Sequence, residues 1–455
     1  MSRKTERIRR NNSAEGMPHF LRVLGNMKYR LIVEGIGVGL LAGMLVSAFR
    51  LSLTKIDEIR SVLLEGAQTK LSLVIWCLLI LFFFTVCVSF LVTREPLCTG
   101  SGIPQVKGEL EGKIKANWLS VIIAKFIGGV MAVGGGLSLG REGPSIQLGA
   151  MVGKGFSRLS GRLRTEERLL MTCGAGAGLA AAFSAPLAGV VFTLEELHKT
   201  FTAEVLLSTM ASAITADWVA SYIFGLRPVF SLTIANSLPL SHYWMVLILG
   251  VIMGTFGVLY NRCIALFQDF FGMLKPAWVK AALPFAAIVL LAIFYPRALG
   301  SGHDLVAFAG EGGAGIKTLL ILLVIKFIFS IFSFGTGAPG GIFLPLLVLG
   351  AVTGGLFTEI VSPLVGYTNT YSSYFVILGM AGYFAAIVRA PITGIILISE
   401  MTGIFTNLLP LAIVSLVAHI TAEIMGGVPI YDQLLDRMMA TRSGARRKTV
   451  RKEPL

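Results

Sequence analysis

Residues 139–150 read LGREGPSIQLGA, and in this stretch one carboxylate, that of Glu142, stands between glycines and a proline amid apolar sequence. On membrane-insertion scales a charge inside the bilayer costs about 2.5–3.5 kcal/mol, so an acid kept there is a functional candidate. Glycines and a proline before an apolar helical run also leave backbone N–H groups free at a helix start, and such an end attracts anions. An acid at an anion-attracting helix end indicates a gate.

The composition of the chain is that of a polytopic membrane protein. Of its 455 residues, 55% are hydrophobic and 14% are charged, and the mean hydropathy is +0.78, whereas soluble domains carry about 25% charged residues. The clearest span is Leu71–Val92, which has no charge over slightly more than the roughly 20 residues that cross a bilayer. Further candidate spans are Leu31–Ala48, Trp118–Leu137, Leu169–Leu194, Trp244–Tyr260, Ala281–Tyr295, Leu319–Phe334, Tyr374–Val388 and Leu408–Ala418. Several are short, glycine-rich or interrupted, which predicts an all-α fold of tilted and broken helices.

Basic residues crowd the two ends of the chain, whose net charge is +14. The positive-inside rule therefore places both termini in the cytoplasm, with a basic segment at 1–30 and a basic tail at 438–455. Nucleic-acid binding is the weaker interpretation, because aromatic side chains do not alternate with the basic ones in these segments. The first 30 residues also lack the apolar core of a cleaved signal peptide.

Motifs for cofactors, metals and catalysis are incomplete. Gly174–Gly178 begins like a dinucleotide-binding loop, but Leu179 replaces the last glycine, and Ile316 interrupts a phosphate-loop pattern. The five cysteines are scattered, without paired spacing or nearby histidines. We therefore expect no cofactor, no metal and no enzymatic activity.

The two halves of the chain share an ordered series of matches. Gly100-Ser101-Gly102 recurs as Gly300-Ser301-Gly302, Lys125 as Lys326, Pro144 as Pro345, Ala185-Pro186 as Ala390-Pro391, and Glu195 as Glu400. The offsets of 200, 201 and 205 are nearly constant, which predicts one repeat at about 71–225 and a second at about 243–425. Interrupted segments at corresponding places favour inverted repeats, with a site between facing helix starts near the midplane, over a parallel duplication.

Two further segments carry candidate anion ligands. Ser101 offers a hydroxyl between two glycines and before a proline, and a hydroxyl with free amides can hold a small anion weakly enough for rapid turnover. In the second half, glycines precede Ile342 and Phe343, whose amides could donate to an anion. Tight packing turns between helices remain the alternative for both segments.

Two acids and one tyrosine have open roles. Glu195 and Glu196 end an apolar run, and adjacent helical residues point about 100° apart, so they need not share a role. A membrane-surface position is the alternative for at least one of them. Tyr431 precedes the basic tail and, in the plain interpretation, is an interfacial anchor.

Three motifs in order resemble those of the CLC family of chloride channels and transporters. They are GSGIP at 100–104, GREGP at 140–144 and GGIFLP at 340–345, with Tyr431 near the end. The resemblance covers about 31–437 and implies a membrane domain there, built from two inverted repeats. It also implies a homodimer in which each subunit has its own anion pathway. The short sequence after Tyr431 implies a prokaryotic plasma-membrane protein without a regulatory domain.

The resemblance also implies roles for individual residues. A central chloride would be bound by the hydroxyls of Ser101 and Tyr431 and the amides of Ile342 and Phe343. Glu142 would be the external gate and proton acceptor, and Glu196 the internal proton-transfer acid. Gln105 and Lys107 depart from the family pattern, because many relatives have acids there.

The function expected from this resemblance is chloride/proton antiport, with a passive voltage- or pH-gated chloride channel of the same fold as the alternative. Glu196 favours antiport, since channels of the family usually have an apolar residue there. Ser101 favours chloride over nitrate or fluoride. The partners expected are chloride, protons, membrane lipid and a second copy of the chain, with no nucleic acid. A structural or receptor protein of the membrane would not need Glu142 among helix-start glycines.

Overall fold

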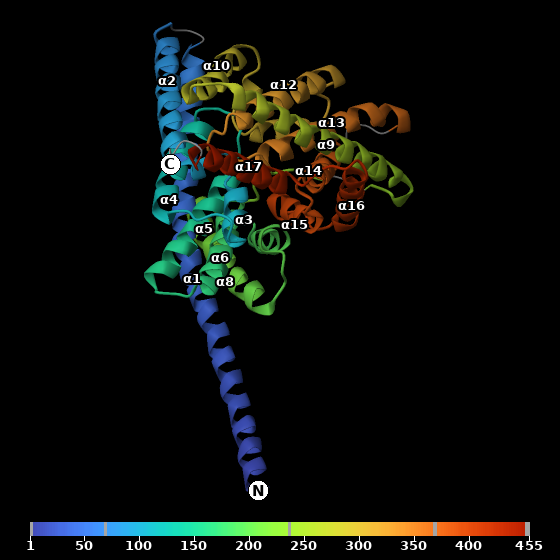
Figure 1. Ribbon diagram of the computed structural model, residues 1–455. Helices are drawn as coiled ribbons and strands as arrows, with labels where there is room; N and C mark the ends of the chain where they lie inside the picture. Colours follow the sequence, from blue (N-terminus) through green and yellow to red (C-terminus); the bar gives the residue numbers. More distant parts are fainter. Residues whose placement is uncertain (1–2, 68–70, 235–237, 367–370, 451–455) are drawn as a thin grey trace.

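The computed structural model describes residues 3–67, 71–234, 238–366 and 371–450, which form helices joined by short connections (Figure 1). Within these ranges there is no β-strand, and one isolated antiparallel bridge joins Gly140 to Gly341. The first half contains α1 (Arg3–Ala67), α2 (Leu71–Arg94), η1 (Pro96–Cys98), α3 (Ile103–Leu110), α4 (Trp118–Gly134), α5 (Glu142–Leu159), α6 (Arg164–Phe183), α7 (Pro186–Phe192), the π-helical turn η2 (Thr193–His198) and α8 (Ala203–Phe224). The second half contains η3 (Leu240–His242), α9 (Trp244–Met273), α10 (Ala277–Phe294), η4 (Pro296–Ala298), α11 (His303–Glu311), α12 (Ile316–Gly335), α13 (Phe343–Val365), α14 (Ser372–Val388), α15 (Pro391–Thr402), α16 (Leu408–Ile424) and α17 (Ile430–Val450). The all-α fold is confirmed.

Helices of two lengths make up the apolar body. In the described part of the chain, five are long and apolar enough to cross a membrane, namely Tyr29–Leu64, Leu73–Arg94, Leu240–Met273, Ile316–Gly335 and Phe343–Val365. The last, α13, is not among the spans expected from the sequence. Five apolar helices of 10–17 residues accompany them, which agrees with the expected short and broken segments.

The expected single span Leu169–Leu194 is wrong, because the chain breaks inside it. Helix α6 ends at Phe183, and Ser184 has the left-handed conformation with φ 52°. Pro186 then opens α7 in its first turn, where a missing N–H costs no intrahelical bond. The apolar composition continues across the break, so hydropathy alone does not reveal it.

The two halves make the same contacts reciprocally, as a two-fold relationship requires. The buried Lys125 donates to the carbonyls of Cys98 and Gly100, at 3.0 and 2.6 Å. Its counterpart, Lys326, donates to Ala298 and Gly300, at 3.1 and 2.7 Å. Each ammonium therefore ties down the loop before a short helix, α3 in one half and α11 in the other.

Backbone pairing between the halves is reciprocal too. Gly100 N donates to Gly337 O at 3.1 Å, and Gly300 N donates to Gly136 O at 2.9 Å. These glycines are equivalent at offsets of 200 and 201, so the second hydrogen bond repeats the first with the roles of the two halves interchanged. The duplication seen in the sequence is thus a structural one, in which a two-fold relation connects the repeats.

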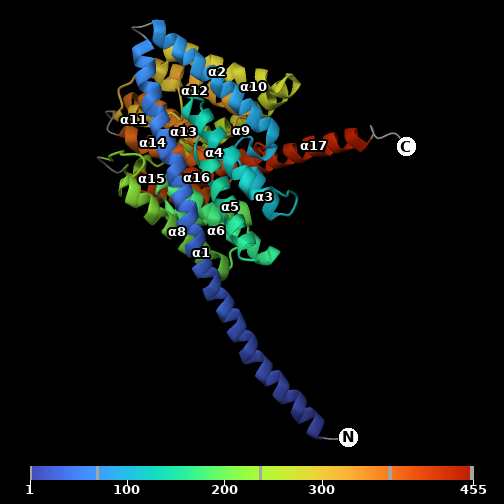
Figure 2. The same ribbon diagram turned by 90° about the vertical axis from the view of Figure 1, so that its left-hand side faces the viewer.

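The longest helices pack in matching ways. Helix α1 packs against α6 and α8, and α9 packs against α14 and α16. Glycines allow the close approach: a Cβ on Gly39 would overlap Ser212 O of α8, and one on Gly254 would lie 2.5 Å from Thr421 Cβ of α16. Figures 1 and 2 show the N-terminal part of α1 projecting from the body, and Figure 2 shows that α17 also extends outward from the body toward the C-terminus.

Candidate functional site

Two helix starts from opposite halves of the chain meet at the centre of the molecule. Helix α5 begins at Glu142 and α13 at Phe343. The bridge before them consists of two hydrogen bonds, from Gly140 N to Gly341 O at 2.6 Å and from Gly341 N to Gly140 O at 2.8 Å. The first N–H groups of a helix have no partner within it, and each helix start carries about half a positive charge. The arrangement therefore favours an anion beside the bridge.

The carboxylate of Glu142 occupies this region. The residue is fully buried, and a Cβ on Gly140 would overlap its Oε2 and lie 3.0 Å from Leu344 N. The side chain thus reaches from the start of α5 to the start of α13. Neither carboxylate oxygen makes a hydrogen bond of regular geometry or an ion pair among the described residues, and the groups that interact with it are the backbone N–H groups of Glu142 and Leu344 at the two helix starts. A buried acid without a counter-charge in contact is costly, so fold stability does not account for it.

Ser101 lies against the first turn of α5. It precedes α3, whose N-cap Gly102 has φ +93°, a conformation that glycine adopts readily. A Cβ on Gly143 would come within 2.5 Å of Ser101 Oγ and 2.6 Å of its carbonyl oxygen, so only glycine permits this approach. The Ser101 side chain is buried, and its hydroxyl has no partner in the described part of the chain.

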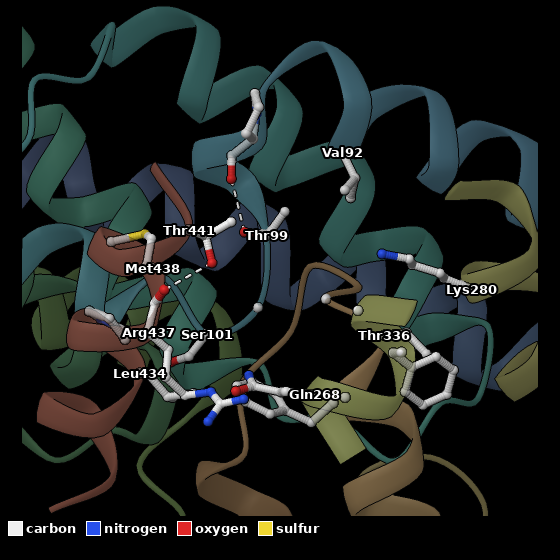
Figure 3. A pocket seen from close by; sticks show the side chains of 18 of the residues that line it. Val92, Thr99, Ser101, Gln268, Lys280, Thr336, Leu434, Arg437, Met438 and Thr441 are labelled. Atoms are coloured by element: carbon white, nitrogen blue, oxygen red, sulfur yellow. Dashed lines mark hydrogen bonds between the residues drawn. The ribbon is translucent and has the colours of Figure 1, made fainter. Parts of the chain in front are cut away.

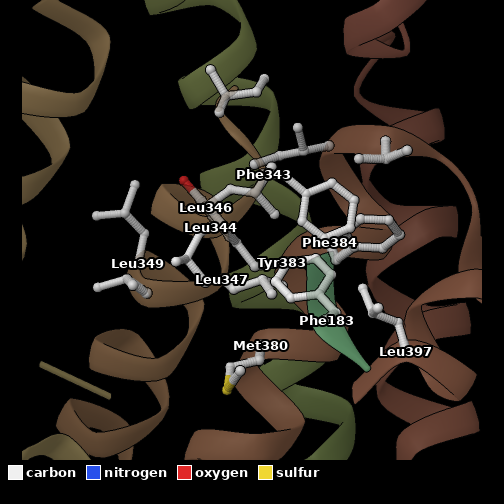
Figure 4. Packing of buried hydrophobic residues seen from close by; sticks show 14 of the residues in the cluster. Phe183, Phe343, Leu344, Leu346, Leu347, Leu349, Met380, Tyr383, Phe384 and Leu397 are labelled. Carbon is white, nitrogen blue, oxygen red and sulfur yellow. The ribbon is translucent and has the colours of Figure 1, made fainter. Parts of the chain in front are cut away.

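Tyr431, at the start of α17, is a further buried polar residue whose contacts lead to this region. It is fully buried, and its hydroxyl likewise lacks a partner among the described residues. Its ring lies edge-on to Phe192 at 6.4 Å between centroids, and Phe192 lies edge-on to Phe343 at 6.3 Å. Figure 4 shows Phe343 in turn packed with Phe384 and Phe183. The aromatic contacts connect Tyr431 to the start of α13, so the interfacial-anchor interpretation does not fit its position.

A cavity of about 530 Å³ leads to Ser101. Figure 3 shows that its walls come from both halves and from α17, with Thr99 and Ser101 on one side and Lys280 and Thr336 on the other. Its polar and charged lining includes Thr99, Gln105, Gln268, Asp269, Lys280 and Arg437. Polar and charged side chains thus line part of a cavity that reaches the buried Ser101.

The adjacent acids Glu195 and Glu196 have separate surroundings. Glu195 accepts hydrogen bonds from Ile392 N at 3.3 Å and Thr393 N at 2.8 Å, so it caps the start of α15. Glu196 is 5% exposed and accepts a 2.7 Å hydrogen bond from Lys107 Nζ. Both lie in the π-helical turn η2, a geometry that is rare and often found at functional sites.

The two residues that depart from the family pattern have definite partners. Gln105 donates to Thr99 O at 2.8 Å beside the cavity. Lys107 is fully buried and pairs with Asp432 as well as with Glu196. Burial of the Asp432 carboxyl is opposed by the Lys107 and Lys199 ammonium groups, which hold its pKa below the ordinary value. The sequence contains no local signal for this cluster, since its members are far apart along the chain.

Comparison with known proteins identifies the family. The family model for the voltage-gated chloride channel matches residues 84–423. A relative from Vibrio cholerae, named H(+)/Cl(−) exchange transporter ClcA, is 38% identical over 413 residues, which cover 88% of each chain. The chain belongs to the CLC family.

Other CLC proteins match over almost the whole chain. The ClcA exchange transporter of Yersinia pseudotuberculosis is 34% identical over 470 residues and covers 100% of this chain and 98% of its own. The crystal structure of a slow cyanobacterial Cl−/H+ antiporter superposes with a TM-score of 0.86 at 33% identity, covering 91% of this chain and 99% of its own. The chain is thus a membrane protein of a transport family and not an enzyme. The described residues contain no group of three or more potential metal ligands.

Proposed function

We propose that the protein exchanges chloride for protons across the membrane. The observation that carries this proposal is the Glu142 carboxylate, fully buried where the two helix starts meet, with Ser101 Oγ packed against the next residue, Gly143. A CLC relative that is 38% identical is named as an H(+)/Cl(−) exchange transporter, which supports the same assignment.

Chloride binds at the centre of the molecule. The ligands are the hydroxyls of Ser101 and Tyr431 and the amides of Ile342 and Phe343, at and just before the start of α13. Hydroxyl and amide donors replace part of the hydration shell without a full positive charge, so the ion can leave again quickly. The cavity that reaches Ser101 is its inner entrance.

Glu142 is the gate. As an anion it occupies a position that chloride also favours, because both are attracted to the two helix starts. Once protonated, the side chain loses this attraction and gives way to chloride. The same group therefore carries the proton and opens the path, which couples the two ions.

Glu196 supplies protons to Glu142 from the inner side. It is buried in η2, and its neighbour Glu195 is committed to capping α15. Tyr431 lies within electrostatic range of both Glu196 and Glu142, so the proton and chloride routes converge near its ring.

A passive chloride channel of the same fold, gated by voltage or pH, is the second candidate. The observation that favours it is the ion pair between Lys107 and Glu196. If that pair never opens, Glu196 cannot carry protons and chloride moves alone.

We further propose a homodimer in the plasma membrane, with both termini in the cytoplasm. All proposed ligands and acids come from one chain, so each subunit has a complete pathway of its own. The membrane domain spans 31–437, between the basic segments 1–30 and 438–455. Because α1 packs on α6 and α8 as α9 packs on α14 and α16, we extend the first repeat from 71–225 to include α1.

The deciding experiment uses purified protein in liposomes. Reversal potentials are measured under crossed chloride and pH gradients. An exchanger reverses between the equilibrium potentials of chloride and protons, whereas a channel reverses at the chloride potential and ignores the pH gradient. The second result would replace antiport by the channel function.

A further inference from the structure

A buried lysine connects the inner acid to the helix that begins next to Tyr431. Lys107, in α3, is 0% exposed. Its Nζ donates to Glu196 Oε1 of η2 at 2.7 Å and also contacts Asp432 Oδ1 of α17. Three separate elements thus meet at one ammonium group. Lys107 and Glu196 themselves are 89 residues apart in the sequence.

The two carboxylates compete for this ammonium. Lys107 favours the charged form of Glu196, because an opposite charge in contact stabilises the carboxylate. Asp432 acts in the other sense, since its own negative charge repels that of Glu196 and its oxygen shares the same ammonium. A proton that arrives on Glu196 removes one of the two partners of Lys107 and leaves it paired with Asp432.

The other groups around Glu196 complete its electrostatic environment. Lys199, just after η2, lies 3.4 Å from Asp432 Oδ2 and is half-exposed. Tyr431, of α17, lies within electrostatic range of Glu196. Helix α6 contacts η2 through Thr172 and His198, 3.3 Å apart, and His198 is the further titratable group on this face. Lys107 is the one cation that touches Glu196 directly among the described residues.

We propose that Lys107 is a positioning residue that sets the pH at which Glu196 takes up its proton, and that Asp432 opposes it by sharing the ammonium. This inference rests on the proposed function, because it assigns a regulator to the inner proton step. It also makes that step conditional on breaking a buried ion pair, and Asp432 compensates the ammonium that would otherwise be left buried without a counter-charge.

The test is the pH profile of chloride-driven proton flux in liposomes for Lys107→Met and Asp432→Asn. Without the Lys107 ammonium, Glu196 takes up its proton at a lower proton concentration. The midpoint of the pH profile of Lys107→Met should therefore move to higher pH by about one unit. Without the competing carboxylate the ammonium holds Glu196 alone, so the midpoint for Asp432→Asn should move to lower pH. Opposite shifts support the proposal, and shifts in one direction or none overturn it.

Two controls separate positioning from folding. Lys107→Arg keeps the charge and should retain a midpoint near that of the unchanged protein. Lys154→Met removes another buried lysine that pairs with α3, through Glu109, away from Glu196. It should lower stability without moving the midpoint, and a shift equal to that of Lys107→Met would overturn the proposal.

Two further results keep the outcome clear. If Lys107→Met does not fold, the midpoint of Asp432→Asn decides alone. The Asp432 side chain is 33% exposed, so its replacement should disturb the fold little. Glu196→Gln tests the underlying function: proton flux that survives this change removes the inner role of Glu196 itself. Loss of proton flux in Glu196→Gln, with unmoved midpoints in the other variants, removes only the role of Lys107.

Discussion

Glu195 and Glu400 are equivalent residues of the two repeats, and each caps the start of a helix in the other repeat. Glu195 accepts from Thr393 N of α15 at 2.8 Å, and Glu400 accepts from Ala188 N of α7 at 2.8 Å. The exchange holds α7 and α15 together, the two short helices that follow the breaks in each repeat. One acid of the adjacent pair is therefore a helix cap, and this is why we propose Glu196 as the proton-transfer acid.

The two acids should therefore respond differently to substitution. Glu196→Gln should lose proton transport and keep chloride transport, because it removes a titratable group without touching the anion ligands. Glu195→Gln should keep both and lose about 1 kcal/mol of stability through its weaker cap. Liposome flux and thermal unfolding in detergent measure the two effects. Swapped effects would make Glu195 the proton-transfer acid.

Glu142→Gln and Glu142→Ala should abolish proton coupling while chloride flux persists. Each removes the proposed proton acceptor at the helix starts, and alanine also leaves the anion position permanently open. The measurement is proton movement against its gradient, driven by chloride. Proton pumping that continues in either variant would contradict the gate assignment.

Ser101→Pro should shift the preference from chloride toward nitrate. Proline removes both the hydroxyl and the amide hydrogen at this position, which are donors suited to a small, partly dehydrated ion. Competition of nitrate with chloride flux in liposomes gives the ratio. Ser101→Thr keeps the hydroxyl and serves as the matched control. An equal shift of the preference in both variants would show that the hydroxyl does not determine the selectivity.

Tyr431→Ala should lower chloride occupancy and loosen coupling, because an open inner side lets anions pass without exchange. Isothermal titration of chloride and the chloride-to-proton ratio in liposomes report the two effects. Tyr431→Phe keeps the ring contact with Phe192 and should affect occupancy alone. Unchanged affinity and coupling in Tyr431→Ala would remove the residue from the chloride site and leave it a packing role alone.

Gly143→Ala should disrupt the central site through Ser101. The added Cβ would come within 2.5 Å of Ser101 Oγ, so the serine must move away from the start of α5. We expect at least a tenfold loss of chloride affinity by titration and a stability loss of about 1–3 kcal/mol from overpacking. Gly272→Ala adds the same methyl group in the wall of the cavity, where a Cβ meets no atom within 4 Å, and as the control it should retain the affinity.

Local sequence alone predicted the features that depend on neighbouring residues. Apolar runs such as Leu71–Val92 appear as helices because a bilayer admits little else. Glycines and a proline around Glu142 marked a helix start, and α5 begins there. The ordered matches between halves, such as Lys125 with Lys326, indicated a duplication, and both lysines make the same contacts.

Only the tertiary structure decided what depends on residues far apart in the chain. The break at Ser184 lies within continuous apolar sequence, and the bridge between Gly140 and Gly341 requires the two repeats to meet. The difference between Glu195 and Glu196 is a matter of partners, Thr393 for one and Lys107 for the other. Hydropathy and spacing act locally, whereas the pairing of buried charges depends on which helices the inverted repeats bring together.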